Sequence, residues 1–406
     1  MIVISVASGT SADGLDVGIV DLAWADHGSA TIDVRVLDSR TEPWPDELRE
    51  RLLGLLPPAT TTAAELCAVD TAVGRAVAAA AVRAAERART LGCDPELLVS
   101  PGQTVHHEVL DGQCLGTLQL GQPAWAAEAT GLPVVSDLRA RDVAAGGHGA
   151  PLVARFDELW LAGTRGPRAA LNLGGIANVT VVAPGRPTTA WDTGPANCLL
   201  DLAAARATAG EWDCDRDGAL ARRGQVDPRL LERLLAHPYF PAAPPASTGR
   251  ETFSAAYLDD ALEHAGPLSW EDVLATLTEL TARTVADGLT GVLTGAGQVP
   301  LAEVVASGGG TANPALMVAL ARHLAPATLR TSDELGIPAG GKEAVMWALL
   351  GFLVWYGVPG ASSATGASHP RLLGRISPGE GPLVLPAPWA TPPRRLRVRD
   401  DDEGAR

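Results

Sequence analysis

Short apolar, β-branched runs alternate along the chain with longer runs of helical character. The runs Ile2–Val6 and Val17–Leu22 flank a Gly/Ser/Asp turn, which predicts a β-hairpin. Asp70–Leu91 is rich in alanine, carries spaced arginines and ends before Gly92, which predicts a long helix. Further strands are predicted at 31–37, 97–100, 133–137, 169–173, 177–182 and 303–306, and helices at 123–130, 197–207, 228–236, 270–287, 313–323 and 344–358.

The second half of the chain repeats the strand–turn–strand pattern of the first residues. A strand at Ala169–Leu173, the pair Gly174-Gly175 and a returning strand at Ala177–Val182 form a second hairpin with a glycine tip. Two such hairpins, each starting a mixed stretch of strands and helices, indicate an internal duplication. The order of elements favours an α/β protein of two similar lobes.

Composition narrows the classes of partner. The chain has 406 residues, of which 46% are hydrophobic and 19% charged, as in globular proteins. A net charge of −15 argues against nucleic acid or an anionic membrane as the main partner, although glycine turns and helix ends can still bind a phosphate-bearing small molecule. The five scattered cysteines suggest neither a disulfide framework nor a zinc site, and the N-terminus reads as a strand, so we expect a reducing cytoplasm.

The densest polar loop is Gly9–Asp16. Its glycines have phosphate-loop spacing, but Leu15-Asp16 stand where that motif needs Lys and Ser/Thr. Backbone N–H groups and hydroxyls could still meet phosphate oxygens, and a carboxylate could orient hydrated Mg²⁺. A plain hairpin turn is the alternative, because Gly, Ser and Asp are common turn residues.

A second loop, Gly336–Glu343, also approaches the phosphate-loop spacing. Its Lys342 is the only lysine of the chain, and Glu343 stands where Ser/Thr is needed. The lone lysine is a candidate for a specific role, with a coding bias towards arginine as the competing explanation. The favoured interpretation of the loop is the N-cap region of a helix that starts at Lys342.

Two further glycine turns follow strands, at Gly174-Gly175 and at Gly308–Gly310. Glycines allow phosphate or a flat ring to approach the backbone closely, and a helix N-terminus can face an anion. In this order, a hydroxyl/Asp hairpin, a Gly-Gly hairpin and a late glycine-rich strand–helix turn form the pattern of actin-like, sugar-kinase and Hsp70-type ATPases.

Asp192 lies at the end of an apolar segment, beside the tight turn Gly194-Pro195. It could be a general base or the N-cap of the helix predicted next, and the residues alone favour the cap. His106 and His107 do not form a metal triad with Glu108, because adjacent strand residues point to opposite faces.

Together these motifs resemble the anhydro-N-acetylmuramic acid kinase family from Ser5 to about Pro378. The similarity rests on an ordered set of motifs: Ser8–Asp16, Gly102–Val105, Thr117–Pro123, Asp137–Pro151, Leu171–Thr180, Asp192–Asn197, Asp217-Gly218, Ser247–Glu251, Gly308–Gly310 with Asn313-Pro314, and Lys342–Ala344. Departures from the family pattern occur at Pro101, Gln122, His148 and Gly340-Gly341, and they concern the sugar side.

The resemblance implies a two-lobed actin-like ATPase fold of ribonuclease H-like type, with nucleotide and substrate in the interlobe cleft. It implies that water opens the 1,6-anhydro ring of anhydro-N-acetylmuramate and that ATP, with Mg²⁺, phosphorylates O6 to give N-acetylmuramate 6-phosphate during cell-wall recycling. Asp192 would be the catalytic base, Asp13 the metal ligand, and Arg139, Asp142 and Glu343 the sugar contacts. The nucleotide would be held by Gly9, Thr10, Ser11, Ala12, Asp13, Gly14, Leu15, Asp16, Gly174, Gly175, Gly308 and Gly309.

We expect lobe I at 1–130, joined by part of 365–392, lobe II at 131–364, and a disordered tail at 393–406. The expected partner is a small-molecule sugar and neither nucleic acid nor a membrane, and a homodimer stays open. Alternative functions are a same-fold kinase of another amino sugar and a sugar-independent ATPase regulatory module.

Overall fold

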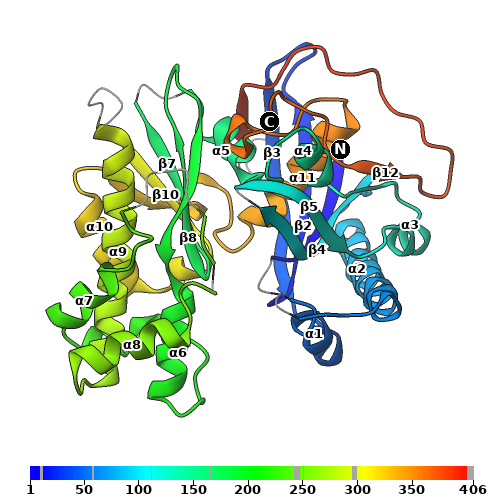
Figure 1. Ribbon diagram of the computed structural model, residues 1–406. Coiled ribbons are helices and arrows are strands. Elements are labelled where there is room, and N and C mark those ends of the chain that lie inside the picture. Colours follow the sequence, from blue (N-terminus) through cyan, green and yellow to red (C-terminus); the bar gives the residue numbers. More distant parts are fainter. Residues whose placement is uncertain are drawn as a thin grey trace. The chain divides into compact units, whose positions relative to one another are not determined.

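The chain folds into two compact units (Figure 1). The computed structural model describes residues 1–9, 12–56, 59–110, 112–163, 166–241, 247–249, 251–294 and 300–399. Unit 1 comprises Met1–Gly163 and Leu335–Arg406, and unit 2 comprises Thr164–Glu334.

Unit 1 is built on a mixed sheet in the order β12-β6-β4-β1-β2-β3-β13, with β5 paired to β4. Its strands are β1 (Ile2–Ala7), β2 (Leu15–Trp24), β3 (Thr31–Glu42), β4 (Leu97–Leu110), β5 (Gln113–Leu120), β6 (Val134–Ser136), β12 (Arg375–Ser377) and β13 (Arg395–Val398). Its helices are α1 (Asp46–Leu53), α2 (Ala63–Thr90), α3 (Ala124–Thr130), α4 (Ala140–Ala144), α5 (Val153–Trp160), α11 (Lys342–Trp355) and the short η5 (Ser363–Thr365).

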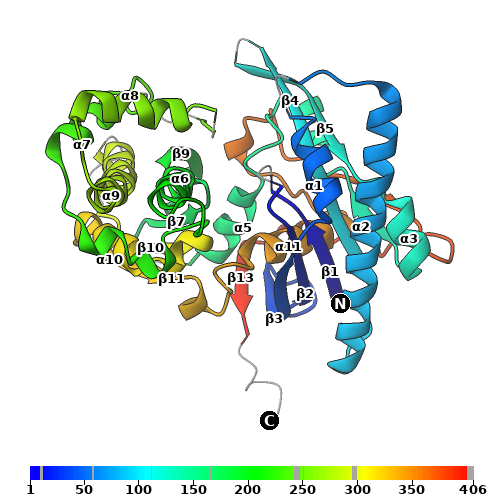
Figure 2. The same ribbon diagram turned by 90° about the horizontal axis from the view of Figure 1, so that it is seen from below.

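Helices α2 and α11 lie on opposite faces of this sheet (Figure 2). Successive side chains of a strand point to opposite faces, and β1 shows this directly. Ile4 belongs to the apolar cluster that includes α2, whereas the Ser5 hydroxyl donates to the backbone carbonyl of Ala344 in α11, at 2.8 Å. Helix α2 begins at the N-cap residue Thr62, whose hydroxyl accepts from the backbone N–H of Glu65.

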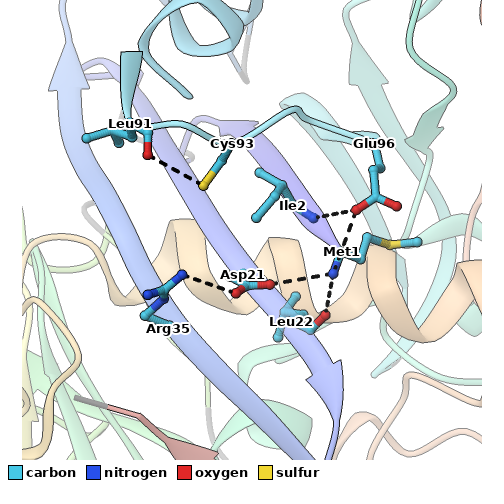
Figure 3. A network of polar contacts seen from close by, with 8 residues as sticks. All are labelled: Met1, Ile2, Asp21, Leu22, Arg35, Leu91, Cys93 and Glu96. Carbon is cyan, nitrogen blue, oxygen red and sulfur yellow. Dashed lines mark hydrogen bonds and ion pairs between the residues drawn. The ribbon is translucent and has the colours of Figure 1, made fainter. Parts of the chain in front are cut away.

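The first strand is also anchored at its beginning by polar contacts (Figure 3). The amino group of Met1 donates to the carbonyl of Leu22 at 3.0 Å and forms ion pairs with Asp21 and Glu96. Glu96 also accepts from the backbone N–H of Ile2. These contacts fix the register of β1 against β2 and against the segment that enters β4.

Unit 2 has a sheet in the order β11-β10-β7-β8-β9 and one apolar core beneath its helices. Its strands are β7 (Arg168–Leu173), β8 (Ile176–Val182), β9 (Thr189–Pro195), β10 (Glu303–Ser307) and β11 (Thr328–Thr331). Its helices are α6 (Asn197–Ala207), α7 (Pro228–Leu235), α8 (Ala255–Ala265), α9 (Trp270–Thr294) and α10 (Pro314–Leu324), with short turns η1 (Arg216–Gly218), η2 (Ala221–Arg223) and η3 (Gly309–Ala312); η4 (Asp333–Leu335) lies at the boundary with unit 1.

The two sheets share one topology. In unit 1, β1, β2 and β3 form an antiparallel meander, and β4 and then β6 add in parallel beside β1. In unit 2, β7, β8 and β9 form the meander, and β10 and then β11 add in parallel beside β7. This is the ribonuclease H-like strand order, repeated, so the predicted two-lobed α/β fold and the duplication are confirmed.

The unit boundaries differ from those predicted. Residues 131–163 belong to unit 1, because β6 pairs in parallel with β4, and so do residues 335–364, because α11 packs on β1, β2 and β4. The segment predicted as a disordered tail contains β13, which pairs with β3. The charged composition of this segment is typical of a solvated tail. Its arginines Arg397 and Arg399 instead bind the buried carboxylate of Asp33, which is far away in the sequence. No helix of the described chain has the length and apolarity to cross a bilayer.

Candidate active site

In unit 1 the predicted nucleotide residues lie in the turn between β1 and β2. The carbonyl of Gly9 accepts from the Gln103 side-chain amide at 3.0 Å and from the backbone N–H of Ala12 at 3.2 Å. Ala12 has φ 51°, a left-handed conformation that only a fixed turn imposes on alanine. Arg49 donates to the Ala12 carbonyl and lies 3.6 Å from the Asp13 carboxylate. Thr10 and Ser11 lie outside the described residues.

The end of this turn is crowded and acidic. A Cβ at Gly14 would lie 2.8 Å from Thr41 Cγ2 and 2.9 Å from the Glu42 carbonyl, so β3 demands glycine there. Leu15 is buried, and the next residue, Asp16, accepts from the Thr41 hydroxyl at 2.7 Å. Burial raises the pKa of Asp16. The hydrogen bond from Thr41 opposes this increase, and the charge of Asp13 adds a smaller one.

Glu343 stands out on α11. Every other residue from 342 to 354 of this helix is buried, whereas Glu343 is exposed. Loss of hydration among the surrounding protein atoms nevertheless raises the pKa of its carboxyl. The negative charge of Asp16 raises it further, and the charge of Arg139 opposes the increase. The Glu343 carboxylate is therefore the one side chain of this part of α11 that is open to a ligand.

Arg139 and Asp142, both predicted sugar contacts, have different environments. Arg139 donates to the Gly149 carbonyl at 2.7 Å, and its guanidinium lies 5.2 Å from the ring centre of Trp347. Asp142 is fully buried, and its two oxygens accept from the Gly149 backbone N–H and the Thr365 hydroxyl, each at 2.8 Å. The geometry favours Asp142 as the anchor of the 142–149 loop, with Arg139 as the nearby cation.

His107 is a candidate that the sequence did not single out for this site. Burial and then the charge of Arg139 lower the pKa of His107 to about 4, so its ring is neutral at neutral pH. Its Nδ1 is buried without a hydrogen-bond partner in the described chain. The neighbouring motif Gly102–Val105 was the available signal. His106 instead meets Glu108 at the surface, and no group of three or more metal-ligating side chains occurs among the described residues.

In unit 2 the turn at Gly308–Gly310 lies beside the end of the strand that leads into Gly174-Gly175. The carbonyls of Gly174 and Gly175 accept from the first N–H groups of α6, at 3.0–3.1 Å. Gly308 has φ +87°, and a Cβ there would lie 2.7 Å from the Asn172 side chain and 2.8 Å from the Leu173 carbonyl. Gly309 follows it at the start of η3. The predicted residues of both turns therefore lie at the same edge of the sheet, where β7 and β10 end.

Asp192 lies on β9, close to that edge. Its Oδ2 accepts from the backbone N–H of Thr248 at 2.9 Å, and its backbone carbonyl accepts from the Tyr239 hydroxyl at 2.6 Å. Burial raises the pKa of Asp192 to about 6; the Thr248 hydrogen bond opposes this, and the charge of Glu251 adds to it. Oδ1 accepts no hydrogen bond within the described chain.

This geometry excludes one of the two interpretations of Asp192. The N-cap residue of α6 is Ala196, and no side chain caps that helix. The cap interpretation is therefore wrong, and Asp192 is a half-buried carboxylate with one oriented oxygen. Thr248 and Glu251 belong to the motif Ser247–Glu251, for which the sequence predicts no role. Thr248 donates its backbone N–H to the Asp192 carboxylate, and the charge of Glu251 acts on it.

Two ribonuclease H-like units with glycine turns and carboxylates at the strand ends define the actin-like fold class, which hosts many functions. The comparisons narrow this class to one family. The model of the family "Anhydro-N-acetylmuramic acid kinase" matches residues 1–379. The chain belongs to this family.

Full-length relatives agree with that assignment. A relative from Streptomyces avermitilis named anhydro-N-acetylmuramic acid kinase is 52% identical over 393 residues, which cover 96% of this chain and 98% of the relative. One from Rhodococcus erythropolis with the same name is 46% identical, covering 98% of this chain and 99% of the relative. A solved ROK hexokinase from Thermus thermophilus is 18% identical, covering 87% of this chain and 99% of that chain, with a TM-score of 0.36.

Proposed function

We propose that this chain is a cytoplasmic, ATP-dependent kinase of anhydro-N-acetylmuramic acid in cell-wall recycling. It opens the 1,6-anhydro ring with water and phosphorylates O6, giving N-acetylmuramate 6-phosphate. The observation that carries the proposal, beyond family membership, is Asp192 with a pKa of about 6 and one carboxylate oxygen left for a water molecule.

Asp192 suits a general base for the ring opening. A base works best when its pKa lies near the operating pH, because it is then ionised and still accepts a proton readily. A pKa of about 6 meets both conditions at neutral pH. The N–H of Thr248 orients Oδ2, which leaves Oδ1 to accept the proton of the attacking water.

The chemical steps then balance. Water oxygen bonds to C1 of the sugar while Asp192 takes one of its protons, and the bond from C1 to O6 breaks. The freed O6 attacks the γ-phosphorus of ATP, and ADP leaves. Acetal opening passes through an oxocarbenium-like state, which nearby carboxylates stabilise. Phosphoryl transfer asks the protein mainly for positioning and charge neutralisation.

The β1–β2 turn fits the phosphates and a magnesium ion. Its shape is held from outside by Gln103 and Arg49, so its backbone is preorganised. Asp13 is exposed at the turn, and Mg²⁺ is commonly held by one or two carboxylates, substrate phosphates and water. When bound, Mg²⁺ would neutralise charge on the phosphates. Gly308, whose conformation requires glycine, would let the nucleotide approach the backbone of unit 2.

Arg139, Glu343 and His107 are the proposed sugar contacts. Arg139 supplies a cation for the acid group of the sugar, and neutral His107 supplies a ring nitrogen that can accept or donate. Glu343 offers a carboxylate to hydroxyl groups. Asp142 holds the loop against which Arg139 is fixed.

The test is ADP formation with and without anhydro-N-acetylmuramate, together with the product mass. We expect ADP only with the sugar, and a product heavier by one water and one phosphoryl group. Sugar-independent ADP formation would favour a regulatory ATPase, and turnover only with another amino sugar would favour a kinase of that sugar.

A further inference from the structure

The only lysine of the chain lies at an unexpected place. Lys342 is the first residue of α11 and is 5% exposed. Its Nζ lies 2.7 Å from Asp157 Oδ1 in α5, and the side chain of Asp157 is 2% exposed. The phosphate-loop spacing before Lys342 therefore does not present its amine to solvent or to a phosphate.

This arrangement does not serve stability alone. A cation at a helix N-terminus opposes the helix dipole. A buried ion pair gains little over apolar residues of the same volume, because both ions lose their hydration. The rings of Phe156 and Trp160 lie 5.9 and 5.5 Å from the amine, which compensates part of that loss.

The ion pair holds the first turn of α11 from one side, and β1 and β2 hold it from the other. The Ser5 hydroxyl donates to the Ala344 carbonyl. A Cβ at Gly18 would lie 3.0 Å from the Ala344 Cβ, so helix and sheet are in close contact there. Between these two attachments lies Glu343, the exposed carboxylate of this turn.

We propose that Lys342 and Asp157 form a positioning pair whose role is to fix the Glu343 carboxylate for the sugar. The pair acts through the backbone of α11 and touches no substrate. This inference rests on the proposed function, because Glu343 is a sugar contact only in that account. It assigns a role to Asp157, which no motif of the sequence had marked.

The test is a cycle of Lys342→Met, Asp157→Leu and the double variant. Each single variant leaves one buried charge without its partner, so the first turn of α11 shifts. A shift of about 1 Å at a positioned group can cost on the order of 10²-fold. We expect KM for the sugar to rise at least about tenfold in both single variants, while KM for ATP stays within about twofold.

The double variant separates positioning from direct contact. Because an apolar pair of similar volume packs as well as a buried ion pair, it should restore the melting temperature and bring KM for the sugar back to within about threefold of wild type. Glu343→Gln, measured in parallel, gives the size of the effect that misplacing Glu343 can reach.

The outcomes are distinct. A double variant that melts like wild type but keeps a raised KM for either substrate would show that Lys342 contacts a substrate, and single variants with unchanged sugar KM would show that the pair positions nothing; either result overturns the inference. Wild-type protein without sugar-dependent turnover would reject the proposed function and, with it, this inference. Normal wild-type turnover beside unchanged variants rejects the inference alone.

Discussion

The two units repeat one strand order but differ in the turn that follows their first strand. In unit 1 this turn carries Asp13, which is exposed, and leads to Asp16. In unit 2 it carries Gly174 and Gly175, whose carbonyls are used by α6. The repeated sheet therefore places a turn at the same edge in both units, and the residues of that turn determine what each unit can bind or catalyse.

The carboxylates of the two units differ in the same way. Glu343 of unit 1 lies near a cation, Arg139, and near the negative charge of Asp16. The carboxylate of Asp192 in unit 2 instead accepts a hydrogen bond from a backbone N–H and lies near the negative charge of Glu251. We therefore propose that unit 1 binds the sugar and unit 2 transfers the proton, and the first two predictions below can break that division.

The largest effect is expected for Asp192→Asn. General-base catalysis contributes about 10²–10⁴-fold, so kcat should fall by at least that order while both substrates still bind. Calorimetry measures binding and a coupled ADP assay measures turnover. Glu343→Gln is the matched control in unit 1, with weaker sugar binding as its main expected effect. Near-normal turnover of Asp192→Asn would break the division between the units.

The pH dependence should report Asp192 as well. Its pKa is raised from 3.8 to about 6, so kcat/KM should rise with pH through about 6 and then level off. Folded protein binds this proton more tightly than unfolded protein, so the associated stability is full below the ordinary pKa and is lost as pH rises through about 6. The residual rate of Asp192→Asn should lack the rise. A wild-type profile flat between pH 5 and 7 would argue against a carboxylate base.

The glycine turns of unit 2 offer a matched pair. Gly308→Ala would put a Cβ into a left-handed backbone beside Asn172 and Leu173, so we expect a loss of about 1–3 kcal/mol in the free energy of unfolding. Gly174→Ala meets only ordinary contacts, at 3.5 and 3.6 Å, and should change that free energy by less than about 1 kcal/mol. Urea unfolding of the two variants tests this, and equal losses would contradict it.

The last prediction, which expects no effect on turnover, concerns an attachment of unit 1 that has no counterpart in the described part of unit 2. Strand β13 brings Arg397 and Arg399 to Asp33, which is 3% exposed, and Trp389 stacks on Trp24 with ring centres 4.3 Å apart. Replacing both arginines with methionine should cost about 1–3 kcal/mol of unfolding free energy, because Asp33 stays buried without them.

The same substitutions should leave kcat nearly unchanged. Thermal unfolding and the ADP assay measure the two quantities. A variant as stable as wild type would mean that β13 is not needed to hold β3.

Local signals predicted much of this molecule. Apolar alternation and glycine placement found both hairpins, the long helix and the turns that carry Gly9, Gly174 and Gly308. The missed features join residues far apart in sequence, such as Lys342 with Asp157 and Thr248 with Asp192. No periodicity encodes such pairs, because they depend on which helices and strands pack together.

The predictions of the unit boundaries and of the C-terminal tail were wrong for the same reason. Strand β6 has only three residues, and it joins unit 1 through pairing with β4. Strand β13 is rich in arginine and reads as a solvated segment until Asp33 is placed beside it. The expected cleft for nucleotide and sugar stays a prediction.

The most direct test of the central claim is turnover of wild-type protein in water labelled with heavy oxygen, with product masses read after rapid quenching. The account predicts one heavy oxygen in the phosphorylated sugar, on its ring-opened carbon, and none in the transferred phosphoryl group. Unlabelled N-acetylmuramate 6-phosphate, held in the same water for the same time, corrects for exchange. A phosphorylated sugar that still has the anhydro mass, or label found only in inorganic phosphate, would contradict the account.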